Sequence, residues 1–281
     1  MRFAPIRLRP ILLTLPFGIP LYAYGLMLTL SVIAGRMLAV RLASRAGIDA
    51  KLADRCALWT FAGAIAGARL LYVVTNLDQF GHVFDILAWW KGGVVAYGGF
   101  LGGLAGAITF CRIHHISLLA WADCVAPSLC VGLAVTRIGC FLGGCDFGRA
   151  WNGPWAVRFP AGSPAFAQHQ LLGLLPPGAT ASLAVHPTQL YESLAGVGLW
   201  CLVAAVRRQR RVPGYALAAF AMGYGVLRYA IEIVRADPDR GSIGPWSTSQ
   251  IIAMGTFAAA AVLLVVLRRK GAALSEAAPT V

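Results

Sequence analysis

The sequence contains few charged residues. Only 12% of its 281 residues are charged and 58% are hydrophobic, with a mean hydropathy of +0.70. A soluble domain usually carries about 25% charged residues, so an ordinary cytosolic enzyme is excluded and a disordered segment is excluded with it. The 32 glycines show no Gly-X-Y period, which excludes collagen. The composition is typical of an integral membrane protein.

Acidic residues and paired cysteines are also scarce. Eleven acidic residues face 24 basic ones, which gives a net charge of +13. Nucleic-acid binding is not the interpretation we favour, because the basic residues stand between long apolar runs; topology signals and anionic lipid explain them better. No CxxC pair occurs among the seven cysteines, most of which lie in apolar stretches. A disulfide framework or a zinc site is therefore not expected, and no metal or cofactor is predicted.

Seven apolar runs have about the length needed to cross a bilayer. They cover residues 18–40, 54–76, 94–112, 117–136, 188–206, 213–234 and 248–267. The third is the weakest because glycines crowd it. The sequence thus predicts an all-α polytopic membrane protein, with residues 1–281 as one membrane domain. Residues 137–187 are too polar and too rich in Gly and Pro to span, and are predicted to form an extramembrane excursion with short strands, one of them over 155–159.

Basic residues in the loops indicate the orientation. The loop after the first run, the 207–211 cluster and the tail after the seventh run are strongly basic. This side is predicted to be cytoplasmic, which puts the C-terminus inside and the N-terminus and the excursion outside. Arg2, Arg7 and Arg9 oppose this orientation mildly.

The charged residues Arg36, Arg69, Arg228 and Glu232 lie within or at the edge of the predicted spans. Each costs about 2.5–3.5 kcal/mol near the bilayer centre unless it is paired or solvated. Arg36 and Arg69 are expected either to snorkel or to enter a polar interior.

Arg228, Glu232 and Arg235 are spaced i, i+4, i+7, which predicts that they share one helix face. Two interpretations stay open. In one, the residues form an intrahelical ion pair that stabilises the span. In the other, two arginines against one glutamate leave excess positive charge that awaits an anion, and a guanidinium grips phosphate with two hydrogen bonds.

Three further stretches carry candidate site residues. Arg137 precedes four glycines within eleven residues, where the backbone is able to approach a ligand. His186 precedes Pro187 at the start of the fifth span and is expected to cap and orient it. In the third span, glycines at a spacing of four predict close helix packing, and Tyr97, just before Gly98 and Gly99, is expected to point into that packed interior.

At these residues the sequence resembles the prolipoprotein diacylglyceryl transferase family. The resemblance rests on residues 137–145 (RIGCFLGGC), 186–192 (HPTQLYE) and 223–228 (GYGVLR) with Glu232 and Arg235. Shorter matches lie at 24–27, 67–70, 97–99 and 247–250. These pieces follow the family's order along most of the chain.

The resemblance implies an enzyme of the bacterial inner membrane with seven helices and a small periplasmic head. It implies transfer of the diacylglyceryl group from phosphatidylglycerol to the lipobox cysteine of a prolipoprotein, without a cofactor. Arg137 matches the lipid-binding arginine, and Arg228 with Glu232 matches a second polar pair. The remaining site residues that it implies are Tyr24, Tyr97, Gly98, Gly99, Gly148, His186, Tyr224 and Arg235. Tyr97 stands where some members carry a histidine proposed as the base, and we expect its phenol either to donate a hydrogen bond to phosphate or to relay a proton towards Glu232.

Two other functions are compatible with the residues alone. Charged residues in the membrane and glycine-broken helices also mark secondary transporters of anionic substrates, although we find no internal repeat between the two halves. A non-catalytic lipid-binding paralogue would keep the arginines and lack a base. A transport assay tests the first, and complementation of a transferase-depleted strain tests the second.

Overall fold

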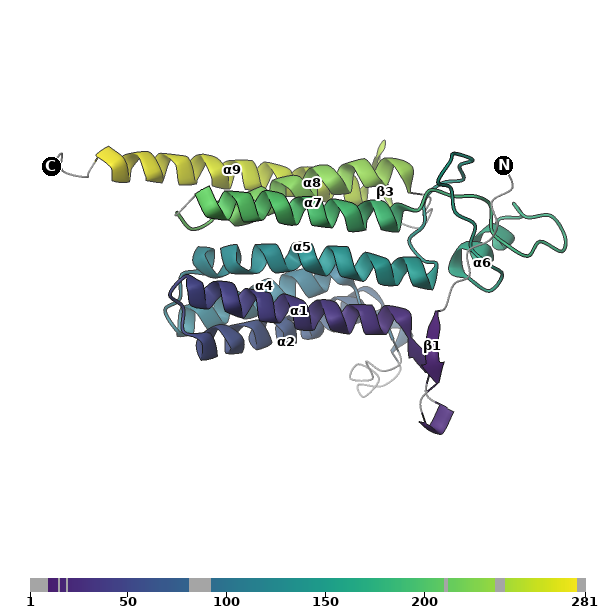
Figure 1. Ribbon diagram of the computed structural model, residues 1–281, viewed down its shortest axis with the longest axis horizontal. Helices are drawn as coiled ribbons and strands as arrows, with labels where there is room; N and C mark the ends of the chain where they lie inside the picture. Colours follow the sequence, from purple (N-terminus) through teal and green to yellow (C-terminus); the bar gives the residue numbers. More distant parts are fainter. Residues whose placement is uncertain are drawn as a thin grey trace. The chain divides into compact units, whose positions relative to one another are not determined.

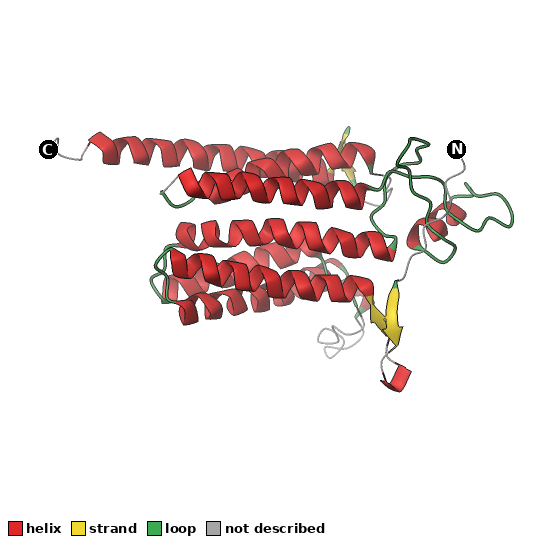
Figure 2. Ribbon diagram, in the orientation of Figure 1, coloured by secondary structure: helices red, strands yellow, loops and turns green. Residues whose placement is uncertain are grey.

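The computed structural model describes residues 10–14, 16–18, 20–80, 92–209, 212–235 and 241–276. These residues are mostly helical (Figures 1 and 2). Seven of the described helices are long and apolar enough to cross a membrane. They are α1 (Ala23–Arg45), α2 (Ala50–Thr75), α4 (Ala96–Ile113), α5 (Leu118–Gly143), α7 (Thr188–Gln209), α8 (Tyr215–Val234) and α9 (Thr248–Glu276). The predicted class, an all-α polytopic membrane protein, is confirmed.

The short elements lie between these helices. β1 (Ile11–Thr14) and β2 (Pro20–Tyr22) form an antiparallel hairpin around the 3-10 turn η1 (Pro16–Gly18), so α1 begins later than its apolar run. η2 (Leu77–Gln79) follows α2, and α6 (Pro164–Leu171) lies between α5 and α7. β3 (Ser242–Ile243) and β4 (Trp246–Ser247) pair just before α9. Several basic residues used for the orientation, namely Arg2, Arg7, Arg9, Arg210 and Arg211, are outside the described residues.

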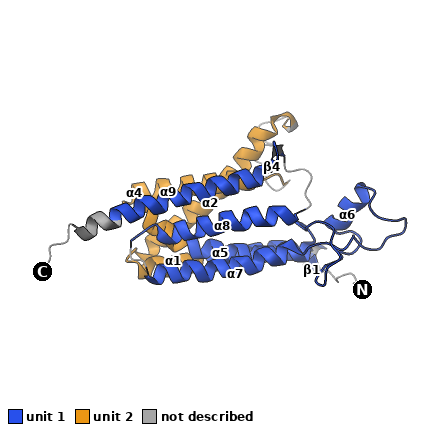
Figure 3. Ribbon diagram, turned by 90° about the horizontal axis from the view of Figure 1, so that it is seen from above, with its two compact units in different colours: residues 1–35, 126–281 blue, residues 36–125 orange. Residues whose placement is uncertain are grey.

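The chain divides into two compact units (Figure 3). One comprises residues 36–125 and the other comprises residues 1–35 and 126–281, so the boundary falls within α1 and α5. We call them the small unit and the large unit. That residues 1–281 form a single membrane domain stays a prediction.

In the small unit, α2 and α4 pack backbone to backbone through glycines. A Cβ built on Gly98 would lie 2.3 Å from the carbonyl oxygen of Gly67, and one on Gly102 would lie 2.1 Å from that of Gly63. No side chain fits at such distances, so these positions must be glycine. The predicted close packing around the glycines of the third span is confirmed.

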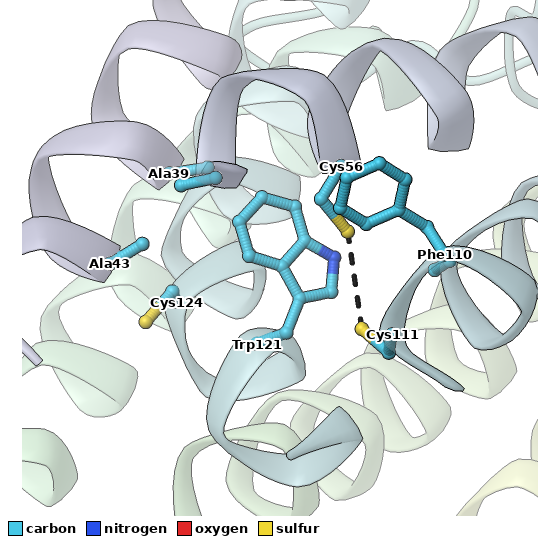
Figure 4. Packing of buried hydrophobic residues seen from close by; sticks show 9 residues of the cluster. Ala39, Ala43, Cys56, Phe110, Cys111, Trp121 and Cys124 are labelled. Atoms are coloured by element: carbon cyan, nitrogen blue, oxygen red, sulfur yellow. Dashed lines mark hydrogen bonds between the residues drawn. The ribbon is translucent and has the colours of Figure 1, made fainter. Parts of the chain in front are cut away.

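The core of the small unit lies beside this contact, where α1, α2, α4 and α5 supply buried side chains. Figure 4 shows the indole of Trp121 between Ala39 and the sulfur pair of Cys56 and Cys111, whose Sγ atoms are 3.9 Å apart. All seven cysteines are free thiols.

Both arginines of the small unit that sequence placed within the membrane have partners. Arg36 donates from Nε and Nη2 to the two carboxylate oxygens of Asp54, at 2.7 and 2.8 Å. Arg69 donates from Nη1 to the carbonyl oxygens of Gly92 and Gly93, at 2.7 and 3.0 Å. Pairing lowers the cost of placing such charges in a bilayer.

In the large unit, α7 packs against α8 and α8 against α9. Ala126 and Cys130 of α5 meet Leu199 and Val203 of α7 and Ala216 of α8 in one buried cluster. This cluster holds together α5, α7 and α8, the helices whose ends carry the charged residues described below.

Residues 144–187, which we call the head segment, belong to the large unit and connect the end of α5 to the start of α7. The strand predicted at 155–159 is wrong: the segment has isolated bridges only, such as Val157 to Val185, and its one regular element is α6. Phe147, Phe159, Ala165 and Val185 form its small core. α5 continues to Gly143, so this helix includes the first seven residues of the predicted excursion.

Candidate active site

Four charged side chains of the large unit form a closed ring of ion pairs. Arg137 contacts Asp146 Oδ2 through Nη1 at 3.0 Å and Glu192 Oε2 through Nε at 2.9 Å. Arg235 contacts Glu192 Oε1 through Nη1 at 3.2 Å and pairs with Asp146 Oδ1 through Nη2. Each arginine thus bridges both carboxylates, and each carboxylate uses one oxygen for each arginine.

The ring is assembled at one end of three helices. Arg137 lies near the C-terminal end of α5, Glu192 lies in the N-terminal part of α7, and Arg235 follows the last residue of α8. Asp146 comes from the start of the head segment. Because α5 and α8 run opposite to α7, the two C-terminal ends and the N-terminal end meet at the same level.

Burial divides the ring into an inner and an outer half. The side chains of Arg235 and Glu192 are 2% and 3% exposed, whereas those of Arg137 and Asp146 are 20% and 29% exposed. Burial acts to raise the pKa of Asp146, but the charges of Arg235 and Arg137 outweigh it and hold that pKa below its usual value. Two arginines and two carboxylates make the ring neutral, and its outer half is open to exchange of partners.

The end of α5 explains how Asp146 reaches the ring. Gly144 has φ +73°, its N–H donates to Phe141, and the N–H of Cys145 donates to the carbonyl oxygen of Cys140 at 3.2 Å. This is a Schellman cap, which turns the chain sharply after the helix. Asp146 then adopts φ +57°, a conformation that aspartate tolerates better than most residues. The Thr188 hydroxyl donates to its carbonyl oxygen at 2.7 Å and fixes it there.

Gly148 locks the head segment against the ring. Its N–H donates to the carbonyl oxygen of His186 at 2.9 Å, and it forms a bridge with Arg235. A Cβ at this position would lie 2.6 Å from His186 Cβ and 2.7 Å from the carbonyl oxygen of Val234. Glycine is therefore required for packing, and this packing positions the backbone that carries Arg235.

A second polar centre lies in the last turns of α8. Arg228 Nη2 contacts Glu232 Oε2 at 2.9 Å and donates to the hydroxyl of Ser249, in the first turn of α9, at 2.8 Å. The side chains of Arg228 and Glu232 are 12% and 8% exposed. Nη1 of Arg228 is buried and has no hydrogen-bond partner among the described residues. A buried N–H group without a partner is costly, and it marks a position for an acceptor.

Arg228, Glu232 and Arg235, which are predicted to share one helix face, take part in two different groups of charges. Arg228 and Glu232 pair within α8 as the spacing indicates. Arg235, at the C-cap of α8, pairs instead with Asp146 and Glu192 of the ring. The excess charge inferred for the three residues is thereby cancelled by Asp146 and Glu192.

Tyr24 and Tyr224 lie on helices of the same unit. A Cβ on Gly139 would lie 3.3 Å from Cα of Tyr24 and 2.9 Å from Cβ of Met27, so α1 packs closely on the last turns of α5. Tyr24 is 43% exposed. Tyr224 lies one helical turn before Arg228, stacks on Phe220, and packs against the cluster of α5, α7 and α8.

His186 is part of an aromatic group at the start of α7. Its ring stacks on Trp151, with centroids 4.2 Å apart, and its Nδ1 is 3.2 Å from the hydroxyl of Tyr191. Burial, and then the charge of Arg149, hold the pKa of His186 below its usual value. These contacts agree with the orienting role expected from the sequence.

Tyr97, Gly98 and Gly99 lie in the small unit. Gly98 is buried against α2, and a Cβ on Gly99 would make ordinary contacts with Ala64 and Ala68. Tyr97 is 42% exposed, so the expectation that its side chain points into the packed glycine interface is wrong. The assignment of the three residues to a substrate site stays a prediction.

The sequence analysis missed Asp146 as a site residue and included Glu192 only as the last residue of the matched stretch 186–192. The signal from which Asp146 and Glu192 could have been found is the excess of arginine, because two arginines at membrane depth require carboxylates. Cys140, Cys145 and Asp146 hold possible metal-ligand atoms within 4.8 Å of one another. Both oxygens of Asp146 already contact guanidinium groups, so this cluster does not favour a cation.

Helices and site together define the class: a polytopic membrane protein with buried arginines gathered at one end of its helices, an arrangement suited to a phosphate group. Residues 10–266 match the prolipoprotein diacylglyceryl transferase family. The chain is similar to proteins named phosphatidylglycerol–prolipoprotein diacylglyceryl transferase, with 33% identity to that of Gloeobacter violaceus over 89% of both chains. That of Thermosynechococcus vestitus is 34% identical, over 86% of this chain and 87% of the relative. That of Geobacter sulfurreducens is 32% identical, over 88% of this chain and 91% of the relative.

The chain therefore belongs to the prolipoprotein diacylglyceryl transferase family. This confirms the resemblance drawn from residues 137–145, 186–192 and 223–228, and it favours the enzyme over the transporter. Seven spans and this family make the chain a multi-pass bacterial membrane protein.

Proposed function

We propose that the chain transfers the diacylglyceryl group of phosphatidylglycerol to the thiol of a prolipoprotein lipobox cysteine. The observation that carries the proposal is the buried Nη1 of Arg228, which lacks a hydrogen-bond partner among the described residues. It lies at the same helix ends as the ring of Arg137, Asp146, Glu192 and Arg235. A phosphodiester supplies the acceptor that this N–H group needs.

Arg137 is the second phosphate ligand in this proposal. Its guanidinium lies in the outer half of the ring, and Asp146 is the most exposed of the four side chains. Phosphate replaces the Asp146 carboxylate on Arg137, while Glu192 holds Nε of Arg137 in place. Arg235 keeps its pair with Glu192, which leaves no buried charge alone.

The reaction is a displacement at carbon. The thiolate of the substrate forms a C–S bond to the glyceryl carbon that carries the phosphate ester, and the C–O bond to phosphate breaks. The electron pair of that bond goes to the phosphate oxygen, which leaves as glycerol phosphate, and the thiol proton is released. Arginines fixed in a water-poor site stabilise the charge that develops on the leaving phosphate.

Activation of the thiol demands little from the protein. A cysteine pKa of about 8.5 lies about 1.5 units above pH 7, which corresponds to roughly 2 kcal/mol. Positive charge near the thiol supplies free energy of this order without a dedicated base.

We also propose the orientation that the loop charges indicate. The head segment and the N-terminus face outside, and the loop around Gln209 and the C-terminus face the cytoplasm. Single cysteines in place of Gln170 in α6 and Gln209 in α7, each in a Cys201→Ser background, test it with a membrane-impermeant maleimide. Labelling of both from the same side overturns this orientation.

The function is tested with purified protein in lipid nanodiscs. A lipobox peptide is incubated with phosphatidylglycerol, and mass spectrometry detects the added diacylglyceryl group. Transfer to the cysteine peptide and none to its Cys→Ser counterpart is the expected result. Glycerol phosphate is released in equal amount. Absence of transfer from phosphatidylglycerol by folded protein overturns the proposal.

A further inference from the structure

Arg158 of the head segment is a partly buried cation whose guanidinium is not neutralised within the described chain. Phe159 next to it is fully buried, and Val157 packs against the same small core. Arg158 between them is only partly buried. Its Nε is buried and has no hydrogen-bond partner among the described residues.

Arg158 lines a pocket of about 270 Å³ together with Leu175, Pro176 and residues 179–183. Hydrogen bonds between residues 159–161 and residues 180–182 hold the wall formed by residues 179–183 in place. Ser182 donates its N–H to the carbonyl oxygen of Phe159 at 2.8 Å, and the N–H of Ala161 donates to that of Thr180 at 3.0 Å. The hydroxyl of Ser182 accepts from Phe159 N–H and donates to the carbonyl oxygen of Leu183. The walls are thus preformed, mostly apolar, and supplied with one cation.

The head segment has no acidic residue to spare for Arg158. Asp146 is the only acidic residue of 144–187, and both its carboxylate oxygens contact Arg137 and Arg235. Because Arg158 Nε has no hydrogen-bond partner among the described residues, a carboxylate brought by a ligand is able to pair with it. Leu171, Leu172 and Leu174 are 87%, 53% and 50% exposed, so apolar contacts for the same ligand are present in the head segment.

We propose that this pocket binds an acidic side chain of the polypeptide substrate, in the part of the substrate that lies outside the membrane. The proposal rests on the proposed function, which requires a polypeptide to deliver its thiol to the arginines. The head segment is joined to that site through the bridge of Gly148 to Arg235, and α6 lies beyond the ends of α5, α7 and α8 (Figure 1). The acyl chains of a lipid stay among the spans, whereas a polypeptide continues past the helix ends and meets the pocket.

Binding measurements test this without the reaction. Fluorescent lipobox peptides carry Ser in place of the cysteine and a single Glu moved through the five following positions, each with a matched Gln peptide. Protein in neutral-lipid nanodiscs is expected to bind at least one Glu peptide roughly 10-fold more tightly than its Gln partner, the value of one hydrogen bond to a charged group. Arg158→Gln is expected to abolish the difference. Arg208→Gln is the control. It removes the same charge near the C-terminal end of α7, the end away from the head segment, and it is expected to preserve the difference.

A second variant guards against misfolding. Ala179→Glu places a carboxylate in the pocket wall and leaves Arg158 unchanged, and it is expected to remove the preference as well. The proposal is overturned if wild-type protein binds every Glu and Gln pair equally. It is also overturned if Arg158→Gln keeps the preference, or if phosphatidylglycerol vesicles compete for the pocket better than the Glu peptide does. If the wild type transfers no diacylglyceryl group but keeps the binding preference, only the proposed function is contradicted, because peptide binding is measured in a separate experiment.

Discussion

Arg137 and Arg235 share one carboxylate: Glu192 gives Oε2 to Arg137 at 2.9 Å and Oε1 to Arg235 at 3.2 Å. The side chain of Glu192 is 3% exposed, so this pairing is made away from water. Asp146, which lies between the same two guanidinium groups, is 29% exposed and is therefore the carboxylate that a ligand reaches from solvent. Glu192 is therefore the fixed member of the ring, and the exposed Asp146 is the exchangeable one.

Glu192→Gln should destabilise the protein strongly. The change keeps the shape of the side chain and removes the charge that two arginines share, and breaking a buried ion pair costs about 3–5 kcal/mol. Thermal unfolding in detergent should show a large drop in the midpoint. Asp146→Asn, at the exposed side of the same ring, should cost clearly less. Equal midpoints for Glu192→Gln and the wild type would contradict the assigned role.

Arg137→Lys should separate phosphate binding from folding. Lysine retains the positive charge that Asp146 and Glu192 require, but a point charge lacks the two-pronged geometry of guanidinium. We expect transfer to fall by roughly 10- to 100-fold, while the protein stays folded in the membrane. Arg137→Ala should abolish transfer and also lower stability, because the ring then carries excess negative charge. A lysine variant with wild-type turnover would show that Arg137 is not a phosphate ligand.

Gly148→Ala should reduce both stability and transfer. Its Cβ would meet His186, Val234 and Thr188 at 2.6–2.8 Å, and relief of such overlap typically costs about 1–3 kcal/mol. The displacement that relieves the overlap would move the backbone at Val234 and with it Arg235. Gly132→Ala in α5 is the matched control, since a Cβ there meets nothing within 4 Å, and alanine favours a helix. If both variants unfold at the same temperature, the close approach at Gly148 is not important.

The spans and the glycine packing could be predicted because they depend on local pattern. A run of about 20 apolar residues has few alternatives to a spanning helix. The spacing of Gly98, Gly102 and Gly106 places all three on one face, where α2 supplies Gly63 and Gly67. The boundary of α5 was missed because Gly144 ends the helix through a cap that involves Cys140 and Cys145. That cap depends on one backbone conformation and not on hydropathy.

The ring could not be predicted because its members are brought together by tertiary structure. Asp146 follows a glycine pair and has the sequence context of an ordinary turn residue. Glu192 fits the first turns of a helix for local reasons, which conceals its contact with two arginines. Arg235 continues the spacing of Arg228 and Glu232, and its partners Asp146 and Glu192 come from the head segment and α7.

Acid should loosen the head segment below about pH 6.5. His169 is 4% exposed, and its Nδ1 accepts the N–H of Leu183 at 3.3 Å. Burial lowers the pKa of His169, so the unfolded chain binds a proton more readily than the folded one. Its stabilisation is complete above the unfolded pKa of about 6.5 and decreases as the pH falls below that value. Unfolding midpoints at pH 7.5 and 5.5 should differ less in His169→Gln than in the wild type; an unchanged difference would assign the acid sensitivity to another group, such as His186.

Arg228 and Glu232 should act as a pair that binds and orients, and a double variant distinguishes this from a structural pair. Arg228→Met with Glu232→Gln removes both charges together and leaves no orphan charge, so the protein should retain its abundance and its unfolding midpoint. If the pair serves only the fold, transfer should continue. If Nη1 of Arg228 holds the phosphate and Glu232 aims the guanidinium, transfer should be lost, and phosphatidylglycerol should bind less tightly. Ser249→Ala removes the other hydrogen bond to Arg228 and should lower transfer by roughly 10-fold through loss of orientation. Turnover in the double variant close to that of the wild type would show that the pair is structural.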